Sequence, residues 1–230
     1  MKKKVLLVSL VAALIASSTI IPVSAATAVD TEVVSNAEAA NAAVAGDVKL
    51  DEATFPDAVF REYLKSNYDK NKDGNLSKEE VAATREIKLG NSSVTNLKGI
   101  ENLTELTYLE VMGTGITELD VSKNTKLTLI DCADTKISNL DLSNNTALKT
   151  LWCYNAPITK LDLSKNTSLG VLRASGTAIT ELDLSNNKEL TYLECDGTNI
   201  TELSLANNSK LQWLTCADTK VQNLDIKNLS

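Results

Sequence analysis

A 21-residue repeat fills the second half of the chain, and it limits the possible folds more than any other feature. Leucines begin six successive units, at Leu106, Leu127, Leu148, Leu169, Leu190 and Leu211. Each unit places apolar residues at its positions 1, 4, 6, 11, 14 and 16, and asparagine stands at position 19 of all but the last. One such unit cannot bury its own leucines, so we expect the units to stack as coils around a shared core.

Two stretches within each unit alternate inward and outward residues. Positions 4 and 6 form one apolar pair and positions 14 and 16 the other, which predicts two short parallel β-strands per coil. A degenerate unit with similar spacing begins at Ile87, ahead of the first full one. The asparagine column is expected to satisfy backbone groups at each corner through its side-chain amides. The predicted fold is a repeat solenoid over residues 87–230.

Each unit contains two nested copies of one leucine motif. In the third unit the motif residues are Leu148, Leu151, Cys153 and Ile158, followed by Ile158, Leu161, Leu163 and Asn166. Both copies fit L-x-x-L-x-L/C-x-x-N-x-L, except that alanine or threonine replaces the asparagine of the first copy. In these residues the chain resembles secreted bacterial leucine-rich-repeat proteins of the internalin-like type. The resemblance implies a leucine-rich-repeat solenoid and leaves open which half of the unit lines its concave face.

The N-terminus has the pattern of a secretory signal. Lys2, Lys3 and Lys4 precede an apolar stretch over 5–21, and Ser24 and Ala25 end a small-residue cleavage site. We expect a signal peptide over 1–25 and a flexible linker over 26–48, with an uncleaved membrane anchor as the alternative. The protein is therefore expected to be secreted or held at the cell surface, with no stable membrane span once the signal is removed.

Residues 69–80 match the calcium-loop pattern D-x-[DN]-x-[DN]-G-x5-E at every fixed position. The expected ligands are oxygens of Asp69, Asn71, Asp73, Asn75, Ser77 and Glu80. We predict that residues 49–86 form a small α-helical, EF-hand-like cap on the first coil, with Ca²⁺ as a structural cofactor. The alternative is a helical turn that keeps this geometry without the ion. The resemblance also implies such a cap, because repeat domains of this type commonly follow a short F-P-D-x-x-F helix, here Phe55-Pro56-Asp57 and Phe60.

All four cysteines occupy position 6 of their units, at Cys132, Cys153, Cys195 and Cys216. Valine or alanine takes this position in the other units, so we expect the cysteines to be small buried hydrophobic residues. Secretion would permit disulfides between neighbouring coils, although parallel side chains suit the disulfide torsion poorly. A zinc site is not expected, because no C-x-x-C motif is present.

Composition argues against several functions. The chain has no histidine, which excludes Ser-His-Asp and Cys-His catalysis. Its net charge of −7 disfavours binding to nucleic acid or to anionic membranes. The uniform aspartate column at position 15 does not supply two carboxyls in different environments, as a glycosidase requires. We therefore predict that the protein is not an enzyme.

The outward positions of the first predicted strand are diverse, whereas those of the second are nearly uniform. The first carries every aromatic residue of the repeats, which are Tyr108, Trp152, Tyr154, Tyr192 and Trp213. Exposed aromatics on a rigid sheet are typical binding anchors, although they can also serve cross-strand packing. We predict an interaction module that binds an extracellular protein partner through these residues. A carbohydrate-binding protein that stacks sugars on them is the alternative, and a structural spacer is a third possibility.

Overall fold

The computed structural model describes residues 47–222 and 224. The predicted signal peptide lies outside the described residues, and so does almost all of the predicted linker. The described part of that linker includes Val48, which belongs to strand β1 (Val48–Lys49). Within the described ranges, no helix is both long enough and apolar enough to cross a membrane.

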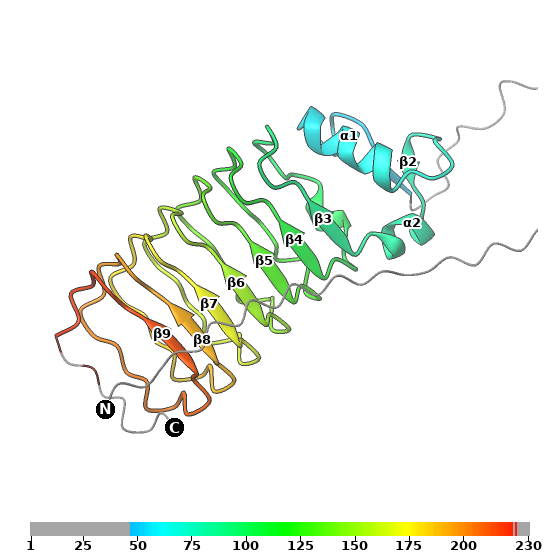
Figure 1. Ribbon diagram of the computed structural model, residues 1–230. Coiled ribbons are helices and arrows are strands. Elements are labelled where there is room, and N and C mark those ends of the chain that lie inside the picture. The colour runs from blue at the N-terminus through cyan, green and yellow to red at the C-terminus, as the bar shows by residue number, and fades with distance from the viewer. Residues whose placement is uncertain (1–46, 223, 225–230) are drawn as a thin grey trace, which may run out of the picture. The chain divides into compact units, whose positions relative to one another are not determined.

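One parallel sheet runs along the stacked coils in the order β3 to β9 (Figure 1). Its strands are β3 (Glu86–Lys88), β4 (Tyr108–Glu110), β5 (Leu129–Asp131), β6 (Thr150–Trp152), β7 (Val171–Arg173), β8 (Tyr192–Glu194) and β9 (Trp213–Thr215). From β4 onward the register joins residues one repeat apart, so that Leu109 faces Ile130 and Leu151 faces Leu172. The structure confirms a parallel β-solenoid with 21-residue coils, and β3 shows that the degenerate unit forms a coil too.

The prediction of a second strand in each coil is wrong for the residues described. Positions 14–16 do alternate, since Leu119 and Val121 are buried and Asp120 is exposed, but they form no ladder apart from an isolated bridge at Ser204. The aspartates of this column instead accept the N–H of the serine two residues later, as Asp120 does from Ser122 at 2.9 Å, which turns the chain. An alternation of apolar and polar residues indicates which side chains point inward. It does not determine whether neighbouring backbones pair.

Asparagines at position 19 join each coil to the one before it. In Asn145 the amide nitrogen donates to the carbonyls of Val121 at 3.1 Å and Asn124 at 3.0 Å. The same pair of bonds recurs at Asn124, Asn166, Asn187 and Asn208. All five asparagines are fully buried, so the expected role of the asparagine column is confirmed.

Threonine replaces the first-motif asparagine because a hydroxyl suffices at that corner. Thr135 donates to the carbonyl of Cys132 at 2.7 Å, and Thr177 makes the equivalent bond to Ala174. The cysteines nearby are free thiols. Cys153, like Cys132 and Cys195, is fully buried, as expected for a small apolar residue, and burial raises its pKa to about 12. Cys216 differs in being only partly buried.

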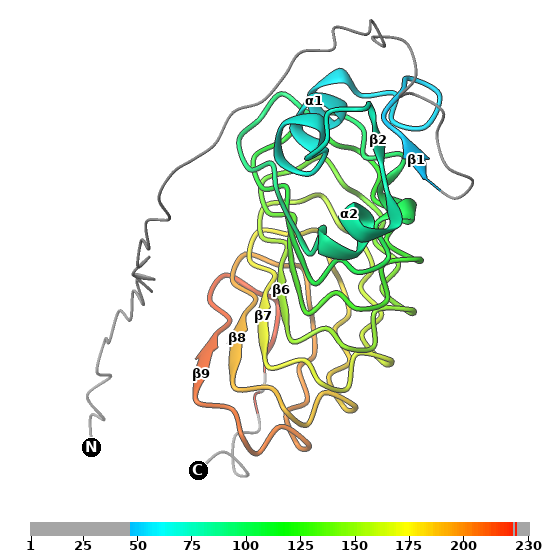
Figure 2. The same cartoon turned by 90° about the vertical axis from the view of Figure 1, so that its right-hand side faces the viewer.

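A small helical unit precedes the first coil and lies against it (Figure 2). It contains α1 (Ala58–Asn67), β2 (Asn75–Leu76), which pairs with β1, and α2 (Lys78–Ala83). A short 3₁₀ helix, η1 (Ile100–Asn102), follows in the first coil. Helix α1 buries Phe60 and Leu64, and the ring of Phe55 meets that of Phe60 edge-on at 5.5 Å. Gly99 is required where this packing meets the coil, because its φ is 102° and a Cβ there would lie 2.2 Å from the Phe55 ring.

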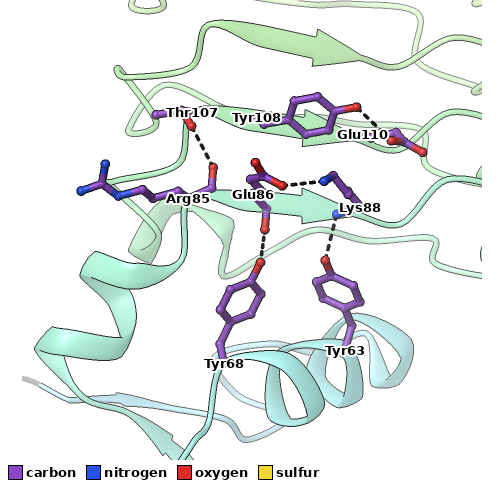
Figure 3. Close-up of polar contacts among 8 residues, drawn as sticks. All are labelled: Tyr63, Tyr68, Arg85, Glu86, Lys88, Thr107, Tyr108 and Glu110. Carbon is purple, nitrogen blue, oxygen red and sulfur yellow. Dashed lines mark hydrogen bonds and ion pairs between the residues drawn. The ribbon is translucent and has the colours of Figure 1, made fainter. Parts of the chain in front are cut away.

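Two tyrosines of this unit cover the open edge of β3 (Figure 3). The hydroxyl of Tyr68 donates to the carbonyl of Glu86, and the N–H of Lys88 donates to the hydroxyl of Tyr63 at 3.0 Å. Those backbone groups face away from β4, whereas the N–H of Leu89 bonds to β4. An unpaired strand edge is a template for association, and here side chains take the place of a further strand.

Candidate functional site

The sheet face is the surface formed by the outward side chains of β3–β9 together with Tyr154, which lies two residues beyond β6. In-register pairing arranges the first and third residues of the strands in two columns, with strands about 4.8 Å apart. The five aromatic residues predicted to bind a ligand all lie on the sheet face or at its margin, and all are half-buried. The structure brings four of them into one cluster and leaves Tyr108 apart on β4.

Arg173 links the two aromatics nearest the middle of the sheet. Its guanidinium carbon lies 5.6 Å from the ring centre of Trp152 and 5.1 Å from that of Tyr154, which are cation–π distances. The Nε of Arg173 lies 2.5 Å from a carboxylate oxygen of Glu194 on the next strand. One cation therefore holds two rings and one carboxylate in a fixed arrangement.

Tyr192 and Trp213 complete the cluster. Their rings are stacked between β8 and β9, with centres 5.7 Å apart and planes 4° from parallel. The hydroxyl of Tyr192 donates to Glu194, which connects this pair to Arg173. Rings stacked across neighbouring strands turn their faces toward each other, so their edges point away from the sheet.

Tyr108 has polar surroundings of a different kind. The Nζ of Lys88 lies 5.1 Å from its ring centre, and its hydroxyl donates to Glu110 at 3.0 Å. Lys88 itself pairs with Glu86 (Figure 3). The N-terminal part of the sheet face is therefore charged, whereas the part from β6 to β9 is rich in aromatic residues.

Asp131 is the residue whose placement the sequence did not reveal. It ends β5 between Glu110 and Trp152 in the column of third residues, and it is only 2% exposed. Among the described residues, its carboxylate accepts one hydrogen bond, from the N–H of Ala133 at 3.1 Å. Burial raises the pKa of its carboxyl above the ordinary value, and the charges of Glu110 and Asp134 add to this effect, whereas the hydrogen bond from Ala133 and the charge of Arg173 oppose it. The sequence shows a polar residue at an outward position, but only the packing of its neighbours buries it.

The loop matching the calcium pattern connects α1 to α2. The carboxylate of Asp69 accepts the N–H groups of Asp73 at 3.2 Å and Gly74 at 3.0 Å. The side chain of Asn71 lies in the same network, with its oxygen accepting the N–H of Asp73 at 3.1 Å. Gly74 has a φ of 82°, which suits glycine at the sharp turn. Asp69 and Asn75 are buried in this loop.

Glu80 reaches from α2 back to the start of the loop. Its two oxygens accept the N–H of Lys70 at 2.7 Å and that of Ser77 at 2.9 Å, the second bond forming a capping box. Partial burial works against ionisation, but these hydrogen bonds hold the pKa of Glu80 below its ordinary value. Over the described part of the chain, no three His, Cys, Asp or Glu side chains are gathered closely enough to hold a metal. The predicted ligands thus share one loop, where their carboxylates bind backbone N–H groups.

A parallel sheet with one short strand per 21-residue coil, buried leucines and an asparagine ladder defines a leucine-rich-repeat β-solenoid. The chain is similar to Internalin J of Listeria monocytogenes, with 35% identity over 71 residues, which are 31% of this chain. The chain covers 8% of the length of that protein.

Two solved structures share this fold. The chain is similar to internalin C2 of L. monocytogenes, with 26% identity, a TM-score of 0.72 and coverage of 80% of this chain and 83% of the other. A leucine-rich-repeat protein of Leptospira interrogans has 16% identity and a TM-score of 0.58, and its match covers 64% of this chain and 41% of that one, which supports the fold alone. No protein-family profile matches the chain.

Proposed function

We propose that this protein is a non-catalytic interaction module, secreted or held at the cell surface, that binds a protein partner through the sheet face. The observation that supports this best is the cluster of Trp152, Tyr154, Arg173, Tyr192 and Trp213. Aromatic residues and arginine are the side chains that contribute most to protein interfaces. Their contacts with one another hold them in place before a partner arrives, which lowers the entropic cost of binding.

A protein partner fits this cluster better than a stacked sugar does. Stacking a sugar requires an open aromatic face, but Tyr192 and Trp213 cover one face of each other, and Arg173 lies over Trp152 and Tyr154. Each of these rings therefore has one face already occupied, and the charged groups among them suit the mixed apolar and polar surface of a protein.

The absence of catalysis is proposed from the uniformity of the other carboxylates. Asp120, Asp141, Asp162 and Asp183 have the same environment, in which hydrogen bonds from the following serine lower the pKa of each carboxyl. Acid–base catalysis by two carboxyls requires that their pKa values be pushed apart. A column of equivalent, ionised aspartates offers no such pair.

The double substitution Trp152→Ala with Tyr154→Ala is expected to weaken partner binding by about 30-fold or more, since hot-spot truncations cost about 2 kcal/mol or more. Partners would be captured from surface-protein extracts on the immobilised chain, identified, and their dissociation constants measured, with a glycan array in parallel. The matched control is Asp120→Asn with Asp141→Asn, on the half of the coil that lacks the sheet. Equal affinities for the aromatic variant and the wild type would contradict the proposal, and selective glycan binding would favour the carbohydrate alternative.

We also propose that the loop over 69–80 binds Ca²⁺ and stabilises the helical unit. The donor set supports this, because it consists of the hard oxygen ligands that calcium prefers. Glu80 already crosses to the start of the loop, near Asp69. Binding would use oxygens of Asp69, Asn71, Asp73, Asn75, Ser77 and Glu80 and would require Glu80 to exchange its N–H partners for the ion.

Calcium is expected to raise the melting temperature by several degrees. Extracellular modules bind calcium with dissociation constants of roughly 10⁻⁴–10⁻³ M. Calcium at about 10 mM should therefore stabilise the folded state, because it binds the folded chain and not the unfolded one. In a chain of this size, each kcal/mol of stabilisation raises the melting temperature by about 2–4 °C. Calorimetric scans in calcium and in chelator would measure the shift. Glu80→Gln should abolish it, whereas Glu79→Gln, which alters the adjacent acid of α2, should preserve it. Identical melting of the wild type in both buffers would contradict calcium binding.

A further inference from the structure

Strands β4 and β8 carry the same tripeptide, Tyr-Leu-Glu, but different neighbours. In both, the tyrosine hydroxyl donates to the glutamate. On β8, Glu194 is neutralised by Arg173 of the adjacent strand. On β4, Glu110 stands beside the carboxylate of Asp131. Neither Glu110 nor Asp131 forms an ion pair among the described residues, although Lys88 faces Glu110 in register on β3. The carboxylates of Glu86, Glu110, Asp131 and Glu194 on this surface are therefore accompanied by two cations, Lys88 and Arg173.

Asp131 is the more unusual of these two carboxylates. One of its oxygens accepts the N–H of Ala133, and the other has no hydrogen-bond donor within residues 47–222 and 224. The residue is nevertheless 98% buried, since only 2% of its surface is exposed. A charge that is largely removed from water and accepts one hydrogen bond destabilises a fold, and perturbed groups of this kind are concentrated at functional sites.

Arg173 shows how a cation fits on this surface. It lies over the rings of Trp152 and Tyr154 and against a carboxylate. Trp152 stands between Arg173 and Asp131 in the column of third residues, because β6 pairs with β5 on one side and β7 on the other. The side of the indole toward β5 therefore offers a second cation the same combination of aromatic ring and carboxylate.

We propose that Glu110, Asp131 and Trp152 form a site on the sheet face for a lysine or arginine side chain of a protein partner. This inference rests on the proposed function and adds the chemistry of the partner at one point of the interface. The excess of carboxylates favours a cation, because Lys88 and Arg173 form their ion pairs with Glu86 and Glu194 and act on Glu110 and Asp131 only at longer range. The net charge of −7 also favours encounter with a basic surface.

The first test measures stability without any ligand. Asp131→Asn keeps an oxygen for the N–H of Ala133 and removes only the charge, so we expect the melting temperature to rise by a few degrees. Asp183→Asn is the control, because its carboxylate is exposed and accepts the N–H of Ser185 at 2.9 Å. It should leave the melting temperature unchanged or lower it. A clear loss of stability in Asp131→Asn would show that the charge serves the fold, and would overturn the proposal.

The second test measures cation binding directly. The chain has two tryptophans, so its NMR spectrum contains two indole N–H signals, which Trp213→Phe would assign. The probes are the blocked tripeptides Gly-Lys-Gly and Gly-Arg-Gly, with Gly-Gln-Gly as the uncharged control. We expect a saturable shift of the Trp152 signal with the cationic probes, lost in Asp131→Asn and in Glu110→Gln and retained in Asp183→Asn. No saturable shift, an equal shift at Trp213, or an equal response in Asp131→Asn would overturn the proposal.

The cation site and the sheet-face interaction can be tested separately. If the tripeptides leave Trp152 unaffected but the Trp152 and Tyr154 double variant loses its protein partner, the cation site is wrong and the sheet-face interaction stands. If the tripeptides bind but the double variant keeps its partner, the partner binds elsewhere and the proposed function fails. A neutral glycan that binds equally well to the wild type and Asp131→Asn would overturn the cation site as the recognition element.

Discussion

Replacing Asn145 by aspartate is expected to unfold the central coils at neutral pH. The amide nitrogen of Asn145 donates to two backbone carbonyls of the preceding coil, and the residue is completely buried. Aspartate has nearly the same shape but no donor, so an ionised carboxylate would face two carbonyl oxygens. Losing the two bonds costs about 1–3 kcal/mol each, and the buried charge adds to this. We expect a total above about 4 kcal/mol in denaturant unfolding followed by circular dichroism.

The neighbouring Asn144 provides the control, because it is exposed. Asn144→Asp should change stability by less than about 0.5 kcal/mol, although it adds the same charge one residue away. The effect of Asn145→Asp should also depend on pH. The introduced carboxyl would have a folded pKa above its unfolded value, so the destabilisation is relieved as pH falls and the protonated acid regains a donor. Equal stability of the two variants would show that the asparagine ladder contributes little.

Replacing Asp57 by alanine is expected to loosen the helical unit from the first coil. One oxygen of its carboxylate accepts the N–H groups of Val59 and Phe60 at the start of α1, and the other accepts those of Thr95 and Asn96 in the coil. The helix cap contributes about 0.5–2 kcal/mol and each junction bond about 1 kcal/mol, so a loss of about 2–4 kcal/mol is expected. Hydrogen exchange should become faster across α1 and at Thr95 and Asn96, and the loss should appear in unfolding of the helical unit.

Asp51→Ala is the matched control for this junction. Asp51 accepts the N–H of Thr54 in a local turn and makes no contact with the solenoid among its hydrogen bonds. Asp51→Ala should lower stability by less than Asp57→Ala does, and it should leave hydrogen exchange at Thr95 unchanged. Similar exchange profiles for the two variants would contradict the junction role of Asp57.

The junction should also weaken in acid. Partial burial by itself would raise the pKa of Asp57. Hydrogen bonds from Thr95, Phe60 and Asn96 outweigh this effect and hold the pKa below its ordinary value. A carboxyl with a lowered folded pKa contributes its full stability above the unfolded pKa and loses it as pH falls through the folded pKa. The difference in stability between the wild type and Asp57→Ala should therefore shrink below about pH 4.

The repeat pattern is sufficient to predict the coil, its length and its core. Leucines such as Leu148 and Leu151 repeat at fixed spacing, and a short unit can bury them only by stacking on its neighbours. The role of Asn145 was equally predictable, because a buried amide in every coil must satisfy backbone groups. These features follow from periodicity, which a single chain displays in full.

The surface of the stack, in contrast, depends on how neighbouring coils pack in three dimensions. The spacing of Leu119 and Val121 gave no indication that the aspartate between them would turn the chain and leave each coil with one strand. The aromatic positions on the sheet were predictable, but their linkage through Arg173 and the burial of Asp131 depend on side chains one repeat apart. Such contacts depend on which residues of neighbouring coils meet and how their side chains pack, and no local pattern in the sequence records that.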